Sequence, residues 1–530
     1  MKRPPISVLI RIVSKVWIFA IAYACQTPPT ATKGQRAYPF GIHADRTTYQ
    51  QARETYVQRD SARAFDANII LSSQEEEVNQ KLIALRQGMI RQYQQQHFFP
   101  PAHNFYQSKR LIEQTQLFRI LRKMPKGGIL HLHPGASGNL RWVVETALKT
   151  PNCYVYWKEG HPTFVKGQLD FFKPAMVPEG FYSVWSLSKT VPHFADSLYN
   201  LLTFDAGMNR PGTDVWREFE ACFQRVGRFV RYQPVFRNFF REAFATLAED
   251  GVQHVELRTF LGVGLHDLDH PPGYYTTDTL VRYYQEAVYD TQKKYPDFTA
   301  KLIYTNHRFQ PQQVIDRDVE RAFRMRKRYP DWITGYDLVA EEDRGQPTRY
   351  YLDTWLKLDS LEQVYGIDLP LFLHDGESDW ISRDNLYDAV TLGSRRIGHG
   401  FNLFLFPSLV EAVRAHDVNV EVSPLSNQIL GYVQDLRVHP ARALLQQGVQ
   451  CSINPDDPAV FGYEGVTYDY WAIFLAWELD LRALKKLAMN SITYSSLSDT
   501  EKETAMQRWQ QRWDTFITYC QELSLETNHP

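Results

Sequence analysis

Short apolar runs alternate with longer amphipathic stretches from residue 127 onwards. Each run ends in polar or ionisable residues and is followed by apolar positions at helical spacing. This alternation is typical of a parallel sheet with helical crossovers. The pattern predicts eight strands: Gly128–His133, Val252–Arg258, Lys301–His307, Ile333–Ala340, Leu369–His374, Arg396–His399, Asn419–Ser423 and Gln450–Asn454. Eight such units favour an α/β fold of the (β/α)8 TIM-barrel type over an open sheet.

The segment before the first strand, about residues 44–122, reads as helical. Ser72–Glu75 has the pattern of a capping box, and Val78, Leu82 and Met89 then recur at helical spacing. Few strand signals occur here. We therefore expect an N-terminal helical extension that packs on the main domain or on a second subunit.

The first and second predicted strands are too far apart for a plain crossover. The intervening residues, about 150–212, hold Pro, Gly and aromatic residues in irregular order, so we expect an insertion on the barrel rim. The predicted organisation is residues 1–25 as a signal peptide, 26–122 as the helical segment with a role in dimerisation, and 123–520 as the barrel domain.

The first residues of the chain resemble an export signal. A short basic start precedes the apolar run Val16–Cys25, which is too short to span a membrane comfortably, and Ala22–Ala24 fits the small-x-small cleavage rule. Because Cys25 follows directly, the same residues also fit a bacterial lipoprotein signal with lipid on Cys25. The predicted location is periplasmic or outer-membrane lipoprotein, or secreted. An amphipathic helix is the alternative, which the Pro-rich stretch after it disfavours.

Composition and cysteine spacing exclude several classes of protein. With 59 Lys and Arg against 60 Asp and Glu, the chain lacks the charge expected of a nucleic-acid binder. Four cysteines remain after Cys25, without a CxxC pair: Cys153, Cys222, Cys451 and Cys520. This excludes a cysteine-rich zinc module and leaves one disulfide open. The zinc nucleobase deaminases combine a His-x-Glu tripeptide with a cysteine pair. This chain has the tripeptide His254–Glu256 but no such pair, so we interpret the tripeptide as ordinary strand.

Ionisable residues gather where the predicted strands end. They end the first, fifth and sixth runs or follow the eighth: His131, His133, His374, His399, Asp456 and Asp457. All strand ends of a barrel meet at one mouth, and imidazole with carboxylate suits zinc. Singly, a His-x-His pair is weak, His399 fits a buried core histidine, and Asp-Asp-Pro fits a turn. Together these residues predict a metal site.

Glu377 stands three residues after His374, just past a strand end. A carboxylic acid at this position could protonate a substrate nitrogen as it becomes basic. The alternative is a glutamate at a helix N-terminus, stabilised by the helix dipole.

Several stretches together resemble one known family. They are Met124–His133, Trp216–Phe223 (WREFEACF), Thr305–Arg308 (TNHR), Gly335–Val339 (GYDLV), His374–Glu377 (HDGE), Arg396–Gly400 (RIGHG), Ser423–Asn427 (SPLSN), Ser452–Pro458 (SINPDDP) and Met489–Tyr494 (MNSITY). In this order they resemble the adenosine deaminase 2 family, also called adenosine deaminase-related growth factors. The likeness runs from about residue 60 to about 518.

The resemblance implies one Zn²⁺ per chain and a role for each residue of the site. Its zinc ligands would be His131, His133, His374 and Asp456. Glu377 would donate a proton to purine N1, His399 would orient the attacking hydroxide, and Asp457 would hold purine N7. The implied reaction is hydrolytic deamination of adenosine, and of 2'-deoxyadenosine, to inosine or its deoxy form and ammonia.

The resemblance also implies a nucleoside-binding wall of Trp216, Glu220 and His307. The spacing in this stretch fits an ordinary amphipathic helix equally well, so the assignment rests on the family. Two departures occur: Pro134 stands where the family usually has an Asp, and Ala340 where it usually has a Gly against the purine. Neither departure changes a predicted metal ligand or the predicted proton donor, so we expect both to affect substrate preference and not the reaction.

We therefore expect an exported, homodimeric adenosine deaminase that binds a small nucleoside and no nucleic acid. One alternative is an amidohydrolase that deaminates another 6-aminopurine or a modified nucleoside. Another is a non-catalytic extracellular signalling or binding protein, which would require a broken catalytic set. Here that set is complete.

Overall fold

The computed structural model describes residues 45–204 and 214–524. The predicted signal peptide and Cys25 lie outside these ranges. Residues 1–58 and 59–530 form separate units, and the architecture described here is that of the second. Helix α1 (Arg46–Arg63) crosses this boundary.

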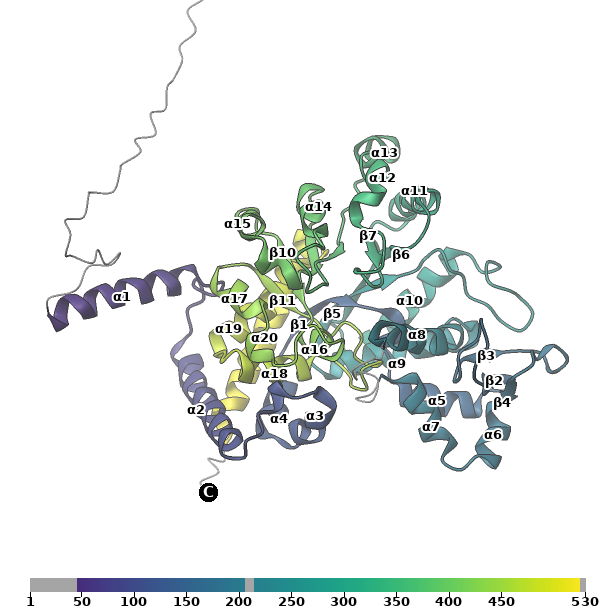
Figure 1. Ribbon diagram of the computed structural model, residues 1–530, viewed down its shortest axis with the longest axis horizontal. Coiled ribbons are helices and arrows are strands. Elements are labelled where there is room, and N and C mark those ends of the chain that lie inside the picture. Colours follow the sequence, from purple (N-terminus) through teal and green to yellow (C-terminus); the bar gives the residue numbers. More distant parts are fainter. Residues whose placement is uncertain (1–44, 205–213, 525–530) are drawn as a thin grey trace, which may run out of the picture. The chain divides into compact units, whose positions relative to one another are not determined.

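Eight parallel strands form a barrel at the centre of the second unit (Figure 1). In chain order they are β1 (Gly127–Leu132), β5 (Val252–Thr259), β6 (Thr299–His307), β7 (Ile333–Val339), β8 (His374–Asp375), β9 (Arg396–His399), β10 (Asn419–Val422) and β11 (Cys451–Ile453). They pair as two four-stranded sheets, β1-β5-β6-β7 and β8-β9-β10-β11. The predicted fold class, a (β/α)8 barrel, is confirmed.

Single bridges close the two seams between these sheets. Leu132 pairs with Asp456 beside β11, and Tyr336 of β7 pairs with Leu371. Asn454 strengthens the first seam, because its Oδ1 accepts the backbone N–H groups of Leu130 (2.8 Å) and His131 (3.1 Å). Where the first and last strands meet, hydrogen bonds to the Asn454 side chain therefore replace some of the backbone hydrogen bonds of a regular sheet.

The fifth predicted strand is much shorter than expected. The sequence pattern predicts Leu369–His374, whereas the ladder of β8 starts only at His374. Pro370 lacks a backbone N–H and contributes only its carbonyl, which accepts the N–H of Tyr336 at 2.8 Å. Leu371, Phe372 and Leu373, which precede His374, are buried but do not form a continuous ladder with a neighbouring strand.

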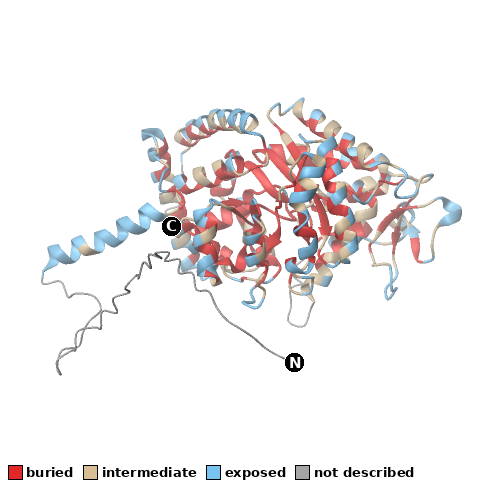
Figure 2. Cartoon of the chain, turned by 90° about the horizontal axis from the view of Figure 1, so that it is seen from above, coloured by how far each residue is buried: buried red, intermediate tan, exposed pale blue. Residues whose placement is uncertain are grey.

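Helices cover the barrel, with buried strands at the centre and exposed residues on the outer helix faces (Figure 2). The helices around the strands are α9 (Gln233–Glu249), α10 (Thr277–Gln292), α11 (Gln312–Arg328), α12 (Leu352–Trp355), α13 (Leu358–Tyr365), α14 (Asn385–Thr391), α15 (Pro407–Ala415), α16 (Pro424–Ile429), α17 (Ala441–Gln446), α18 (Thr467–Ala476) and α19 (Leu481–Thr493). Of these, α16 and α18 are buried along their whole length. This arrangement directs the carboxyl ends of all eight strands to one mouth.

The N-terminal extension continues as α2 (Ser73–Gln95), α3 (Phe105–Gln114) and α4 (Gln116–Lys123). The capping box is present: Ser72 caps α2 and exchanges hydrogen bonds with Glu75. The last helix, α20 (Asp499–Glu522), packs beside α2, and Trp513 of α20 donates to Glu75 at 2.7 Å. Helices α2 and α20, from the early and the last part of the second unit, thus share one core.

The insertion after β1 contains more regular structure than its sequence suggests. A small antiparallel sheet of order β3-β2-β4 is formed by β2 (Cys153–Tyr156), β3 (Leu169–Phe171) and β4 (Phe181–Ser183). Around it lie α5 (Leu140–Lys149), α6 (Val184–Thr190) and α7 (Phe194–Leu202). Strands of three or four residues are too short to show a two-residue period, so the pattern misses them.

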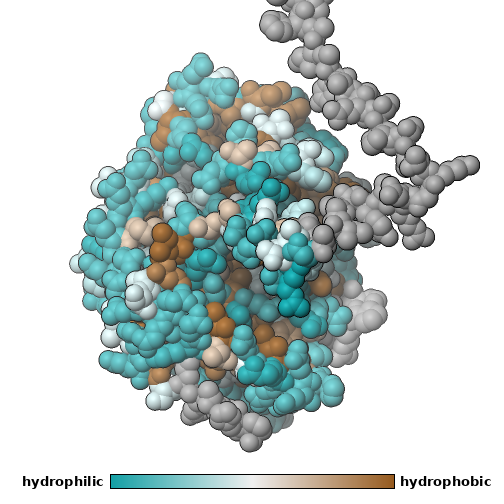
Figure 3. All heavy atoms as spheres, turned by 90° about the vertical axis from the view of Figure 1, so that its left-hand side faces the viewer, coloured by the Kyte–Doolittle hydropathy of each residue, from teal (hydrophilic) through white to brown (hydrophobic). Residues whose placement is uncertain are grey.

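The surface seen in Figure 3 is mainly hydrophilic, with hydrophobic residues in small separate groups. Such scattered apolar residues are ordinary at a protein surface. Of the described helices, none is long and apolar enough to cross a bilayer. The four described cysteines are buried and free of disulfides: Cys153, Cys222, Cys451 and Cys520.

Candidate metal centre and active site

The four predicted metal ligands lie together at the mouth of the barrel. His131 belongs to β1, His133 follows it, His374 begins β8 and Asp456 follows β11. Each offers one ligand atom, and these atoms all lie within 4.8 Å of one another. His131 Nε2 is 3.3 Å from Asp456 Oδ1, and His133 Nε2 is 3.2 Å from it. Residues that are distant along the chain thus converge on one point, as the strand pattern predicts.

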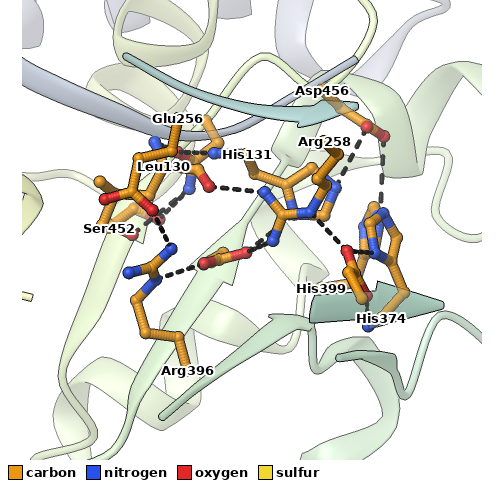
Figure 4. Close-up of polar contacts among 12 residues, drawn as sticks. Leu130, His131, Glu256, Arg258, His374, Arg396, His399, Ser452 and Asp456 are labelled. Carbon is orange, nitrogen blue, oxygen red and sulfur yellow. Dashed lines mark hydrogen bonds and ion pairs between the residues drawn. The ribbon is translucent and has the colours of Figure 1, made fainter. Parts of the chain in front are cut away.

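Buried carboxylates fix the orientation of two of these rings (Figure 4). His131 Nδ1 is 3.0 Å from Glu421 Oε2 on β10, and His374 Nδ1 is 2.6 Å from Asp337 Oδ2 on β7. With Nδ1 held by an acceptor, Nε2 of each ring faces the common point.

The protonation states favour a cation at this point. Burial lowers the pKa of His133, and burial with the neighbouring imidazoles holds the pKa of His374 well below its usual value. Burial opposes ionisation of Asp456, but contacts with His131 and His133 hold its pKa well below the ordinary range. Neutral imidazoles and an ionised carboxylate are the forms that bind a metal.

Two neighbouring residues of the site have left-handed backbone. Asp456 has φ +62° and His399 has φ +63°, a conformation that costs free energy in residues other than glycine. The position of Asp456 is stabilised by its backbone oxygen, which accepts the N–H of His133, and by Ser426 Oγ, which donates to its Oδ2 at 2.9 Å. Strained backbone held by its surroundings is frequent at active sites.

Glu377 lies buried beside this cluster. Its backbone N–H donates to Glu342 Oε2 at 2.6 Å, and its Oε2 is 3.6 Å from His399 Nε2. Burial, together with the charges of Asp456 and Glu342, raises its pKa well above the usual value, so the carboxyl favours its protonated form. The next helix, α14, begins only at Asn385. Glu377 is therefore not a helix N-terminal residue, which removes that alternative.

His399 lies between the acid and the metal cluster. Its Nε2 is 3.6 Å from Glu377 and 3.9 Å from Asp456 Oδ2. Burial lowers the pKa of His399 to about 3, so its ring is neutral. Asp457 is buried next to Asp456, and burial and that charge raise its pKa well above the usual value. A protonated Asp457 can donate a hydrogen bond.

These groups open into a cavity of about 620 Å³. All five predicted substrate residues line it: Trp216, Glu220, His307, Ala340 and Asp457. Trp216 and Glu220 come from helix α8 (Val215–Val230), where residues four apart lie on one face. The cavity is therefore bounded by strand ends on one side and by helix α8, which follows the insertion, on the other.

Helix α8 is held over the cavity by contacts at its first turn. Asp214 caps the helix by accepting the N–H of Arg217, and it also accepts two hydrogen bonds from Arg344, at 2.6 and 2.8 Å. Trp216 Nε1 donates to the hydroxyl of Tyr432 at 3.1 Å. Arg344 and Tyr432 belong to different loops of the barrel rim, so α8 is tied at two points.

Comparisons with known proteins agree with this geometry. The family model for adenosine deaminase matches residues 196–511, and the model for the adenosine/AMP deaminase N-terminal region matches residues 40–121. Adenosine deaminase 2 from Sus scrofa is 34% identical over 89% of this chain and 94% of its own length. Adenosine deaminase 2 from Homo sapiens is 35% identical over 85% and 89%.

The chain belongs to the adenosine deaminase family. Its activity is that of the family, the hydrolytic deamination of adenosine. A solved structure of an amidohydrolase from Burkholderia ambifaria with bound Zn has the same fold, with a TM-score of 0.52 and 17% identity, over 77% of this chain and 95% of that one.

In this adenosine deaminase family member, His307 lies in an aromatic stack at the end of β6. Its ring centroid is 4.3 Å from that of Phe260 and 4.7 Å from that of Phe309. Burial lowers the pKa of His307 to about 4. The ring therefore faces the deaminase cavity as a neutral group.

The two departures from the family pattern also line the deaminase cavity. Ala340 has φ +87°, in the left-handed region that glycine adopts without a steric cost. The backbone thus keeps the conformation suited to the glycine expected there, with an added Cβ. Pro134 follows His133 and begins a short 3-10 turn, where its missing N–H costs nothing.

Reasoning from the sequence misses the buried groups behind the deaminase metal centre. They are Asp337, Glu421 and Arg258, all fully buried inside barrel strands. Asp337 and Glu421 are each the only charged residue of their strands, which is a visible signal, whereas Arg258 lies in a strand with several other polar residues. Their partners lie on strands far apart in the chain, so the sequence alone does not reveal the pairing.

Proposed function

We propose that this protein is a zinc-dependent enzyme that deaminates adenosine and 2'-deoxyadenosine to the corresponding inosines and ammonia. The observation that carries this proposal is the convergence of three imidazoles and Asp456 at the floor of a cavity that also holds the buried acid Glu377. Deamination of adenosine follows from the family. The metal, the second substrate and the residue roles are our proposals.

Zinc fits the chemistry of the four proposed ligands, His131, His133, His374 and Asp456. Three imidazole nitrogens and one carboxylate oxygen suit this borderline ion. His131 Nε2 and Asp456 Oδ1 are buried with no hydrogen-bond partner among the described residues, which a cation would supply. The bound Zn in the Burkholderia ambifaria amidohydrolase supports the choice. When bound, Zn²⁺ lowers the pKa of a coordinated water to about 7 and so supplies the nucleophile.

Glu377 acts as the general acid. Its raised pKa keeps a proton on the carboxyl, which is transferred to purine N1 as that nitrogen becomes basic during attack at C6. The backbone hydrogen bond to Glu342 holds the residue in place. His399 is neutral, and its Nε2 lies within 4 Å of both Glu377 and Asp456, so its ring would orient the attacking hydroxide.

The remaining residues hold the nucleoside. Protonated Asp457 donates to purine N7, and Trp216 and Glu220 on α8 face the ribose side. His307 closes the wall as a neutral ring within its aromatic stack. The Cβ of Ala340 lies against the purine and narrows the site by one methyl group.

We further propose that the protein is exported through residues 1–25, with or without lipid on Cys25. We also propose that it forms a homodimer through residues 26–122, ahead of the barrel domain of 123–520 and its rim insertion of about 150–212. The dimer proposal rests on the resemblance to the family, because the apolar stripe of α2 around Val78 and Leu82 is buried within this chain.

The test is ammonia release from adenosine, 2'-deoxyadenosine, adenine and AMP by the purified protein, with zinc quantified in the same sample. We expect turnover of both nucleosides and about one zinc per chain. Turnover of adenine or AMP with neither nucleoside would favour the alternative, an amidohydrolase acting on another 6-aminopurine. Pro134 and Ala340 are the residues that would account for such a change.

A further inference from the structure

A single guanidinium lies behind the metal centre and contacts both carboxylates that orient its histidines (Figure 4). Arg258 of β5 is fully buried. Its Nε donates to Asp337 Oδ2 at 2.8 Å, and its Nη2 donates to Glu421 Oε2. Its Nη1 donates to the backbone oxygen of Leu130, at 2.5 Å. Three different strands are thus joined by one side chain.

The shared oxygen atoms are those that hold the rings. Asp337 Oδ2 accepts from Arg258 and also lies 2.6 Å from His374 Nδ1. Glu421 Oε2 accepts from Arg258 and lies 3.0 Å from His131 Nδ1. Leu130 directly precedes His131, so the third contact fixes the backbone of the same ligand. Arg258 is therefore linked to two of the four proposed ligands, His374 and His131, through a single carboxylate in each case.

From this geometry we propose that Arg258 is the positioning residue of the metal centre. It sets the positions of Asp337 and Glu421 together, and through them the directions in which His374 and His131 present Nε2. The planar guanidinium fixes the angle between its acceptors, which a lysine ammonium cannot do. This inference rests on the proposed zinc site.

Arg396 provides a matched comparison on β9. It is also buried, and it donates to Glu421 Oε1 and to Glu256 Oε2, both at 2.5 Å. It contacts only one of the two orienting carboxylates, and through the oxygen that does not face His131. Replacing Arg396 removes a buried guanidinium but leaves the contacts of Arg258 with both Asp337 and Glu421.

The experiment compares Arg258→Lys, Arg396→Lys and wild type as zinc-loaded proteins. Zinc release to an excess of a chromogenic chelator is followed by absorbance, and visible spectra are recorded after exchange with Co²⁺. Loss of a group that orients metal ligands typically lowers metal affinity about 10- to 100-fold. We expect Arg258→Lys to release zinc faster by that factor with an altered Co²⁺ spectrum, and Arg396→Lys to change release less than threefold with the wild-type spectrum.

Equal effects of the two variants, or none for Arg258→Lys, would overturn the inference. Wild type that binds no zinc would instead overturn the proposed function. If Arg258→Lys does not fold, the comparison moves to Arg258→Met/Glu421→Gln against Glu421→Gln, which removes the charges as a pair. The double variant should then release zinc several-fold faster than the single one, and equal rates would refute the role of Arg258.

Discussion

The cavity has two halves that are built differently. In the half around His131, His374 and Asp456, the side chains come from strand ends and are buried, and both rings have a buried carboxylate partner. In the half around Trp216 and Glu220, the side chains come from helix α8 and are partly exposed. The first half is held by the barrel, and the second by a few contacts across its rim.

This difference places the proposed catalytic groups in one half of the cavity and the proposed substrate-binding side chains of α8 in the other. A substitution in the barrel half breaks a network of buried charges that spans several strands, so it should disturb the other residues of that network as well. A change in the helical half alters one wall of the cavity and leaves the metal centre intact. Both departures from the family pattern, Pro134 and Ala340, lie just after strand ends and line the cavity, but neither is a proposed ligand or the proposed acid. Substrate preference can therefore vary on an unchanged metal centre.

The largest effect is expected from His131→Ala in the barrel half. It removes a proposed ligand, so zinc should fall from about one per chain to a small fraction and deamination should fall below detection. His254→Ala is the matched control, because His254 is equally buried but lies near Thr299 and Glu256 instead. Metal analysis and ammonia release measure both. Full zinc in His131→Ala would remove this residue from the site.

Glu377→Gln should lower kcat by about 10²- to 10⁴-fold while zinc stays bound, because only the proton donor is lost. Glu341→Gln, a carboxylate partly exposed near the rim, should keep kcat within threefold. Steady-state kinetics with adenosine decide the matter. A kcat of Glu377→Gln within tenfold of wild type would contradict its role as the acid.

In the helical half, Trp216→Phe should raise KM by about two- to tenfold, the value of one net hydrogen bond, and leave kcat and zinc unchanged. Tyr432→Phe removes the other partner of the same bond and should behave alike. A fall in kcat equal to the rise in KM would show that the two halves are not separate.

Ala340→Gly tests the strained position in the wall. Because φ is +87°, glycine should raise the free energy of unfolding by roughly 0.5 to 1 kcal/mol. Ala322→Gly, in the middle of α11, should lower it by about 1 kcal/mol instead. Denaturant titration gives both values. The idea of strain fails if both changes destabilise the protein.

The last prediction concerns the pH dependence of stability. The pKa of His307 is about 4 in the folded protein, below the ordinary value of 6.5 for histidine. Between these values the unfolded chain binds more protons, so this residue lowers stability as the pH falls from about 6.5 to about 4. Thermal unfolding of His307→Gln should therefore decline less over that window than wild type. Parallel curves would show that the ring is not held neutral.

The barrel and the cluster of proposed ligands at its mouth could be predicted because their signals are local. An apolar run that ends in His-x-His or Asp-Asp is visible in a few residues, and barrel topology then brings such ends together. The orienting groups Asp337, Glu421 and Arg258 could not be paired, because each contact joins distant strands. The small sheet of the insertion was missed because its strands are only three or four residues long.

The seam at Asn454 has a consequence for the order of events during synthesis. His131 leaves the ribosome early, whereas Asn454, which accepts its backbone N–H, is made 323 residues later, with Asp456 just behind it. The nascent chain thus carries two imidazoles long before the last strand arrives. Contacts so distant in the chain form late. Closure of the cylinder and completion of the ion-binding set are consequently one and the same late event.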